Sequence, residues 1–138
     1  MNVEAIARNL PALFAALLVS ILFIQSGLDK VFDRKGNLEW LTGHFSKTFL
    51  APLVPVLLFT ITVMELAAGI LCAAGIVYLI FASSAVVIFA GSVIAALSII
   101  ALFFGQRIAK DYAGAATLIP YFILVIILMY LTGPFAKF

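Results

Sequence analysis

Residues 52–75 read PLVPVLLFTITVMELAAGILCAAG, an apolar stretch that is long enough to cross a bilayer as a helix. Its one charged residue, Glu65, lies well inside it. At about 1.5 Å of rise per residue, Glu65 is roughly 20 Å along the helix from Pro52, within a hydrocarbon core that is about 30 Å thick. Because a charged group in hydrocarbon is unfavourable, an intramembrane acid normally faces protein or a cavity. The stretch therefore predicts a membrane protein whose other helices accommodate the Glu65 carboxyl group.

The composition of the whole chain also indicates a membrane protein. Of its 138 residues, 66% are hydrophobic and 10% are charged, whereas charged residues make up about 25% of a soluble domain. The charged residues cluster, and they leave four intervals without charge: 9–28, 48–64, 66–106 and 112–136. We therefore expect an all-α integral membrane bundle of four transmembrane helices, forming a single domain over residues 1–138. The expected spans are about 10–32, 52–74, 78–104 and 112–131.

Breaks in the apolar pattern place the turns between these spans. Gly75 is the expected site of a tight hairpin between the second and third spans, because no charged residue separates them. The segment GQRIAKD, residues 105–111, is the expected loop before the fourth span. Pro120 predicts a kink within that span, because proline cannot donate the helical hydrogen bond.

The segment 33–50, DRKGNLEWLTGHFSKTFL, predicts a short amphipathic helix at the membrane surface between the first two spans. A charged turn centred on Gly36 opens it. Apolar residues then follow at helical spacing: Leu38, Leu41, Phe45 and Phe49. The spacing of Trp40, His44 and Lys47 predicts that they share one face of this interfacial helix. We expect the helix to cap one end of the bundle, with a solvated His44 side chain.

Few residues in the sequence have the spacing that catalysis or metal binding requires. His44 has no second histidine, cysteine pair or carboxylate cluster near it in the sequence, so neither metal nor haem ligation is expected. Cys72, the single cysteine, is interpreted as an inert small side chain within an apolar span. No hydrolase, metalloprotease, phosphate-loop or dinucleotide-binding motif is present. We expect no catalytic residue, no metal and no covalently bound cofactor, and the dispersed net charge of +2 predicts no nucleic-acid partner.

The Glu65 carboxyl group has two competing interpretations. If it is protonated, it hydrogen-bonds to a neutral partner, for which Gln25, Ser20 and the serines of the third span are candidates. If it is ionised, a cation such as Lys30 must neutralise it. We expect the protonated form, with Gln25 or a nearby serine as its partner, because burial disfavours the charged form. Lys30 lies at a different depth by the count of residues, and lysine side chains tend to reach toward the headgroups.

The distribution of basic residues bears on the orientation in the membrane. Most of them fall in segments that the four-span arrangement places on one side: Lys30, Arg34, Lys35, Lys47, Arg107 and Lys110. Arg8 and Lys137 fall on the other side. The positive-inside rule therefore favours cytoplasmic loops and external termini.

Two segments resemble the sequence motifs of the DoxX family. FIQSGLDKVF, residues 23–32, is similar to its motif at the end of the first helix, in which a glycine and then a lysine follow an apolar run. MELAAGILCAAG, residues 64–75, is similar to its second motif, in which a glycine follows a glutamate. The positions that match are Gly27, Lys30, Glu65 and Gly69. Many members have an arginine and a histidine where this chain has Ala16 and Ser26.

The resemblance implies a four-helix integral membrane protein with cytoplasmic termini, opposite to the orientation that the charge count favours. It also implies a small subunit of a thiosulfate:quinone oxidoreductase or a membrane anchor for oxidative-stress enzymes. We therefore expect a non-catalytic subunit or anchor in a prokaryotic cytoplasmic (inner) membrane, with quinone as its cofactor and with a protein partner or a second copy of itself. The candidate intramembrane site comprises Glu65, Gln25, Lys30, Ser26, Gly27 and Gly69. The alternative is a transport protein for a small solute, protons or lipid, with a polar cavity around Glu65.

Overall fold

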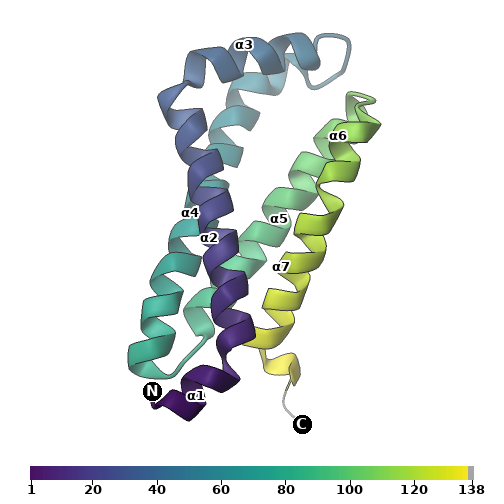
Figure 1. Cartoon of the computed structure of the whole chain (residues 1–138). Coiled ribbons are helices and arrows are strands. Elements are labelled where there is room, and N and C mark those ends of the chain that lie inside the picture. The colour runs from purple at the N-terminus through teal and green to yellow at the C-terminus, as the bar shows by residue number, and fades with distance from the viewer. Residues whose placement is uncertain (137–138) are drawn as a thin grey trace.

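The computed structural model describes residues 1–136, and all regular elements in that part of the chain are helices (Figure 1). They are α1 (Val3–Arg8), α2 (Leu10–Phe32), α3 (Arg34–His44), η1 (Ala51–Leu53), α4 (Val54–Ala82), α5 (Val86–Ile108), α6 (Tyr112–Thr117), α7 (Ile119–Thr132) and η2 (Pro134–Ala136). Four stretches are long and apolar enough to cross a membrane: α2, η1 with α4, α5, and α6 with α7. The expected all-α membrane bundle is therefore confirmed. Lys137, which entered the charge count, lies outside the described residues.

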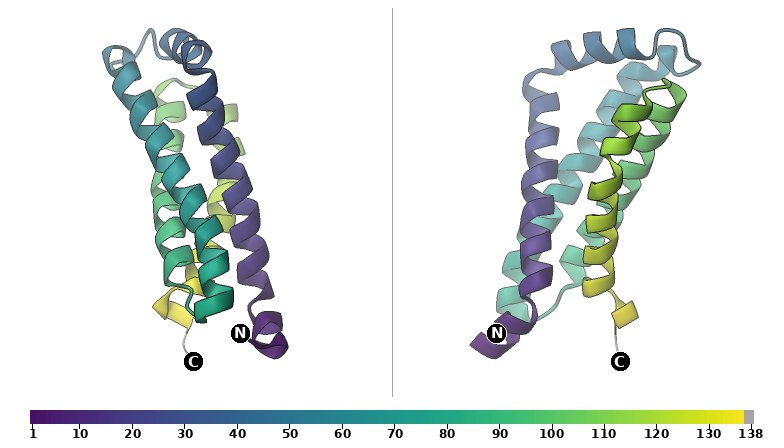
Figure 2. Two further views of the ribbon diagram at one scale, coloured as in Figure 1. Left: turned by 90° about the vertical axis from the view of Figure 1, so that its left-hand side faces the viewer. Right: turned by 45° about the vertical axis from the view of Figure 1, so that its right-hand side comes forward.

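Helix α4 is the centre of the bundle, because it packs against α2 on one side and α5 on another. Helix α7 in turn lies against α5 and α2 (Figure 2). The core side chains with no exposed surface are Ala16, Val19, Ala68, Cys72, Ile88, Ala95, Val125 and Leu128. Large apolar side chains such as Phe14, Phe59 and Phe81 point outward, which is the arrangement expected of a bundle surrounded by lipid.

The hairpin between the second and third spans lies later in the chain than the sequence predicts. Helix α4 continues through Gly75 to Ala82, and residues 83–85 form the turn, with Ser83 in the left-handed conformation at φ 54°. The expected boundaries at residues 74 and 78 are therefore wrong. Glycine within an apolar helix does not end it, because a small residue there lets another backbone approach. A Cβ on Gly75 would lie 2.6 Å from the Ile88 nitrogen, so this glycine marks the contact between α4 and α5.

Helix α3 crosses one end of the bundle and connects α2 to the segment before α4 (Figure 1). The Asp33 side chain caps its N-terminus by accepting a hydrogen bond of 3.3 Å from the Gly36 N–H. The turn thus lies at Asp33, and Gly36, which was expected to be its centre, belongs to the helix. The expected surface helix is confirmed, but it ends at His44.

Apolar side chains of α3 and of the following turns pack onto the ends of α4 and α5. This cluster comprises Leu38, Leu41, Phe45, Leu50, Val54, Ile108 and Ala109. Phe49, the last residue of the expected apolar stripe, is 67% exposed and lies outside the helix. Lys47 is also exposed and lies beyond the helix, so it does not extend the face that holds Trp40 and His44. The prediction of one face shared by these three residues is wrong for Lys47, because the helix ends before it.

The fourth span is interrupted at Leu118, where α6 ends and α7 begins. Pro120 lies in the first turn of α7, where its missing N–H breaks the helical ladder. The helix is thus interrupted two residues before Pro120, close to the position of the expected kink. The end of α5 and the start of α6 lie at the same end of the bundle as α3, whereas α1 and η2 lie at the opposite end (Figure 1).

Candidate functional site

Two glycines bring α2 and α4 into direct contact. A Cβ on Gly27 would lie 2.6 Å from Leu66 Cδ2, and a Cβ on Gly69 would lie 2.8 Å from the Ile24 nitrogen. Both distances are shorter than van der Waals contact. A larger residue at Gly69 would meet backbone and push the helices apart, whereas one at Gly27 would first displace the Leu66 side chain. The two helices run in opposite directions (Figure 1). This contact therefore sets their register, and it places the residues just after Gly27 opposite those just before Gly69.

The register places Lys30 against Glu65. Lys30 Nζ lies 3.1 Å from Glu65 Oε2 and also donates to the Ser26 hydroxyl at 2.9 Å and to the Ser26 carbonyl oxygen at 3.4 Å. The Lys30 side chain is 16% exposed and the Glu65 side chain only 2%. An ammonium group has three donors, and each has a partner here. The structure thus brings together Ser26, Gly27, Lys30, Glu65 and Gly69 of the expected site.

The expected hydrogen bond between Glu65 and Gln25 or a serine is wrong, and the buried carboxylate has a cationic partner. Gln25 lies on the exposed face of α2. The candidate serines Ser20, Ser92 and Ser98 donate their hydroxyl groups to carbonyl oxygens of their own helices. These three hydroxyl groups are thus satisfied without Glu65.

The count of residues from Pro52 misjudges the position of Glu65 relative to Lys30 because it treats the second span as parallel to the first. Helix α4 instead runs obliquely (Figure 1). At about 1.5 Å per residue, it is also longer than a hydrocarbon core of about 30 Å. Its first turns lie close to α3. Glu65, further along α4, lies beside Lys30 near the end of α2.

A cavity of about 380 Å³ lies beneath α3, between the ends of α2, α4 and α5. Its polar lining residues are Lys30, Asn37, Trp40, His44, Thr60 and Gln106. Apolar side chains such as Leu58, Met64 and Leu102 form the remaining walls. Two further lining residues, Leu57 and Phe104, are 39% and 56% exposed, so the cavity opens toward the surroundings of the bundle. The cavity therefore combines a polar end with an apolar body that faces lipid.

His44 joins the roof of the cavity to its opposite wall. Its ring stacks on Trp40 with the centroids 4.4 Å apart. His44 Nε2 lies 2.7 Å from Gln106 Oε1, at the end of α5, and 3.8 Å from Asp111 Oδ2 at the start of α6. The expected solvated histidine is therefore wrong, because His44 is half-buried and bonded. Gln106 was missed in the sequence, where the only signal is a lone amide at the end of an apolar span.

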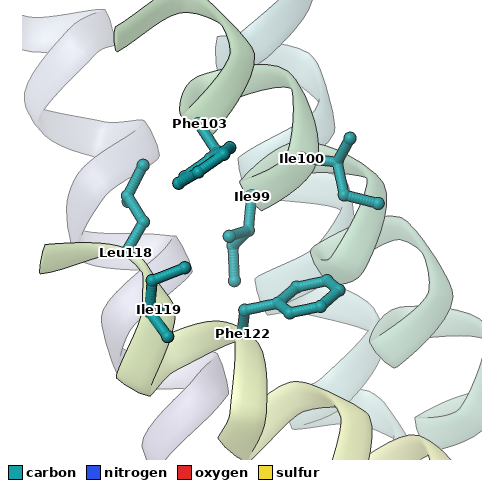
Figure 3. Close-up of a pocket in the computed structure, with 6 residues that line it drawn as sticks. All are labelled: Ile99, Ile100, Phe103, Leu118, Ile119 and Phe122. Carbon is teal, nitrogen blue, oxygen red and sulfur yellow. The ribbon is translucent and has the colours of Figure 1, made fainter. Parts of the chain in front are cut away.

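A second, smaller pocket of about 160 Å³ lies between α5 and the break in the fourth span (Figure 3). It is lined by Ile99, Ile100, Phe103, Leu118, Ile119 and Phe122. These side chains carry no donor, acceptor or charge, so the pocket suits an apolar chain and provides no group that could orient a reactive one. The larger cavity is the candidate site.

Comparison with protein families gives one match. The family model described as DoxX matches residues 12–101, which is α2 through most of α5. The matched region contains both glycines of the contact between α2 and α4 and both members of the ion pair. Comparisons with curated proteins and with solved structures found no match.

Proposed function

Since the chain belongs to the DoxX family, we propose that it is a non-catalytic membrane subunit that binds the head group of a quinone and serves a membrane-associated redox enzyme. Four spans and the family already make it a small multi-pass membrane protein. The single observation that carries the proposal further is the cavity beneath α3, with its polar end and apolar body.

The chemistry of the cavity suits a quinone. A quinone head offers carbonyl oxygens that accept hydrogen bonds and a flat ring that packs against aromatic side chains. The Lys30 ammonium group and the Trp40 indole ring both line the cavity and supply these two kinds of contact. An isoprenoid tail needs a way into the lipid, and the exposed side chains of Leu57 and Phe104 mark where the cavity opens.

The non-catalytic part of the proposal is supported by the kinds of side chain that are present. Within residues 1–136, no group of three or more His, Cys, Asp or Glu side chains could hold a metal ion. The two ionisable groups at the contact between α2 and α4, Lys30 and Glu65, are paired with each other. In this proposal the electrons for quinone chemistry come from a protein partner. We place the assembly in a prokaryotic cytoplasmic membrane, with the α3 end facing the partner.

The rival function is transport of a small solute, protons or lipid, and it needs a path to both sides of the membrane. The residues that line the cavity come from the α3 end of α2, α4 and α5 and from α3 itself. Most of the side chains that fill the other half of the described bundle, such as Val19, Leu79 and Ile88, are apolar and buried. The buried serines there, Ser20 and Ser92, donate to carbonyl oxygens of their own helices. A cavity that lies at one end of the bundle and opens toward lipid favours a binding site over a path across the membrane.

The test is to purify the protein in a mild detergent and to identify bound quinones and partner proteins by mass spectrometry. Thr60→Phe should fill the cavity and lower the amount of bound quinone, because Thr60 lines it. Val63→Phe is the matched control, since Val63 is 50% exposed on the same helix and does not line the cavity. Protein that carries neither quinone nor a partner, or quinone content that is equal in both variants, would contradict the proposal. Proteoliposome uptake that Glu65→Gln abolishes would favour transport.

A further inference from the structure

The cavity contains a cation whose charge is compensated from outside the cavity. Lys30 lines the cavity, whereas its partner Glu65 is 2% exposed and is not among the lining residues. A bound molecule can therefore contact the Lys30 ammonium group directly, whereas the ammonium group separates it from the Glu65 carboxylate. We infer that this pair makes the cavity specific for an uncharged, carbonyl-bearing head group, and that Glu65 is the residue that excludes anionic amphiphiles.

The inference rests on the proposed quinone site and on the electrostatics of a buried pair. An isolated ammonium group at the edge of hydrocarbon attracts any anion strongly, because the local dielectric constant is low and screening by salt is weak. With Glu65 Oε2 only 3.1 Å from Lys30 Nζ, however, the pair carries no net charge, and the carboxylate offsets a large part of the attraction that the ammonium group exerts on an anion. A phosphate, sulfonate or carboxylate head would have to leave water without a net charge to receive it, which is unfavourable.

The hydrogen bonds of Lys30 point to the same class of ligand. Its contacts with Ser26 Oγ and Glu65 Oε2 are 2.9 and 3.1 Å long, and its contact with the Ser26 carbonyl oxygen is longer, at 3.4 Å. The long contact is the one that a ligand can replace with little loss, and a carbonyl oxygen replaces it in kind. An anion would instead compete with Glu65 for the same proton donors. The site thus offers one hydrogen bond from Lys30 and no uncompensated charge.

The other polar groups of the lining do not alter this balance. Asn37, Gln106 and Thr60 are neutral side chains, and Trp40 adds an aromatic ring and one N–H. His44 is held between Gln106 Oε1 and the Asp111 carboxylate, so a negative group also stands behind the histidine. Lys30 is the only lysine or arginine among the lining residues. The neutralisation of its charge by Glu65 therefore decides which head groups the cavity binds.

The protein carries its own reporter for the test. Trp40 is the single tryptophan of the chain, and it lines the cavity. The purified protein is placed in nanodiscs of a zwitterionic lipid and titrated with three quenchers: a decyl-tailed benzoquinone, a brominated dodecanesulfonate and the brominated dodecanol of the same tail. Wild-type protein should be quenched saturably by the quinone, and the sulfonate should bind no better than the alcohol. A wild-type protein that binds the sulfonate better than the alcohol overturns the inference without recourse to any variant.

Replacement of Glu65 should make the cavity bind anionic head groups. In Glu65→Gln the Lys30 charge is uncompensated, and sulfonate binding should tighten roughly tenfold or more, as expected of a close and poorly screened charge pair. Glu39→Gln is the matched control, because it removes the same charge from an exposed position on α3, and it should leave sulfonate binding unchanged. Lys30→Met combined with Glu65→Gln should remove the gain.

The outcomes separate the two proposals. If Glu65→Gln remains folded and binds the quinone but gains no affinity for the sulfonate, the inference fails and the quinone site stands. If wild-type protein is quenched saturably by none of the three probes, the proposed quinone site fails and the inference fails with it. A gain in sulfonate binding that Glu39→Gln reproduces shows a general effect of net charge and also overturns the inference.

Discussion

Gly69 lies so close to Ile24 that a Cβ on the glycine would stand 2.8 Å from the Ile24 backbone nitrogen. Gly69→Ala should therefore separate α2 from α4 and lower the free energy of unfolding by about 1–3 kcal/mol, the usual cost of overpacking. Thermal unfolding in detergent measures the loss. Gly43→Ala is the control, because nothing lies within 4 Å of a Cβ there. Equal stability of the two variants would show that the contact is looser than described.

The ion pair gives a second prediction. Lys30→Met leaves Glu65 buried without its cation and should lower the free energy of unfolding by about 3–5 kcal/mol. Lys35→Met, at an exposed position, should have little effect. The double variant Lys30→Met with Glu65→Leu should recover most of the loss, because an apolar pair replaces the charged one. Losses that simply add in the double variant would mean that the two residues do not interact.

His44 gives a third prediction, which concerns the motion of α3. His44→Phe keeps a ring that can stack on Trp40 but removes the hydrogen bond to Gln106, a loss of about 1 kcal/mol. Amide hydrogen exchange in residues 34–44 should then be faster, because α3 opens more often. Lys47→Ala, an exposed position after the helix, is the control. An unchanged rate of amide hydrogen exchange in His44→Phe would show that apolar contacts alone hold α3 in place.

The turn between α5 and α6 gives a fourth prediction. Lys110 has a left-handed backbone with φ 60°, a conformation that costs a residue with a side chain about 1–2 kcal/mol. Lys110→Gly should therefore raise the free energy of unfolding by about 1 kcal/mol. Lys35→Gly, within α3, should lower it by about 1 kcal/mol, because glycine disfavours helix. Thermal unfolding of both variants gives the signs, and a destabilised Lys110→Gly variant would count against the strain.

The sequence was sufficient to predict the architecture and part of the site. Long apolar runs are visible directly in the sequence, and the surface helix follows from the spacing of Leu38, Leu41 and Phe45. The motif residues Gly27, Lys30, Glu65 and Gly69 were also identified from the sequence, as candidates for a site. Their spatial relation was not, because it depends on the close contact of two helices and on the oblique path of α4.

Two other errors have local physical causes. A glycine within an apolar run looks like a turn in sequence, but Gly75 serves a contact between helices, and the turn falls where Ser83 adopts a left-handed conformation. The bond between His44 and Gln106 joins residues 62 positions apart in the chain. Such a pairing is set by the position of α3 over the end of α5, and neither helix indicates it alone.

The position of Lys30 and Glu65 on successive spans has a consequence for biosynthesis. The first span is synthesised before the second, so Lys30 is already at the membrane surface when the segment with Glu65 reaches the insertion machinery. Glu65 would then enter the bilayer close to its counter-ion, and the glycine contact between α2 and α4 would hold the two helices together. Helices α2 and α4 would thus insert as a pair. A substitution of Lys30 would impair the insertion of α4 before it affects the function of the folded protein.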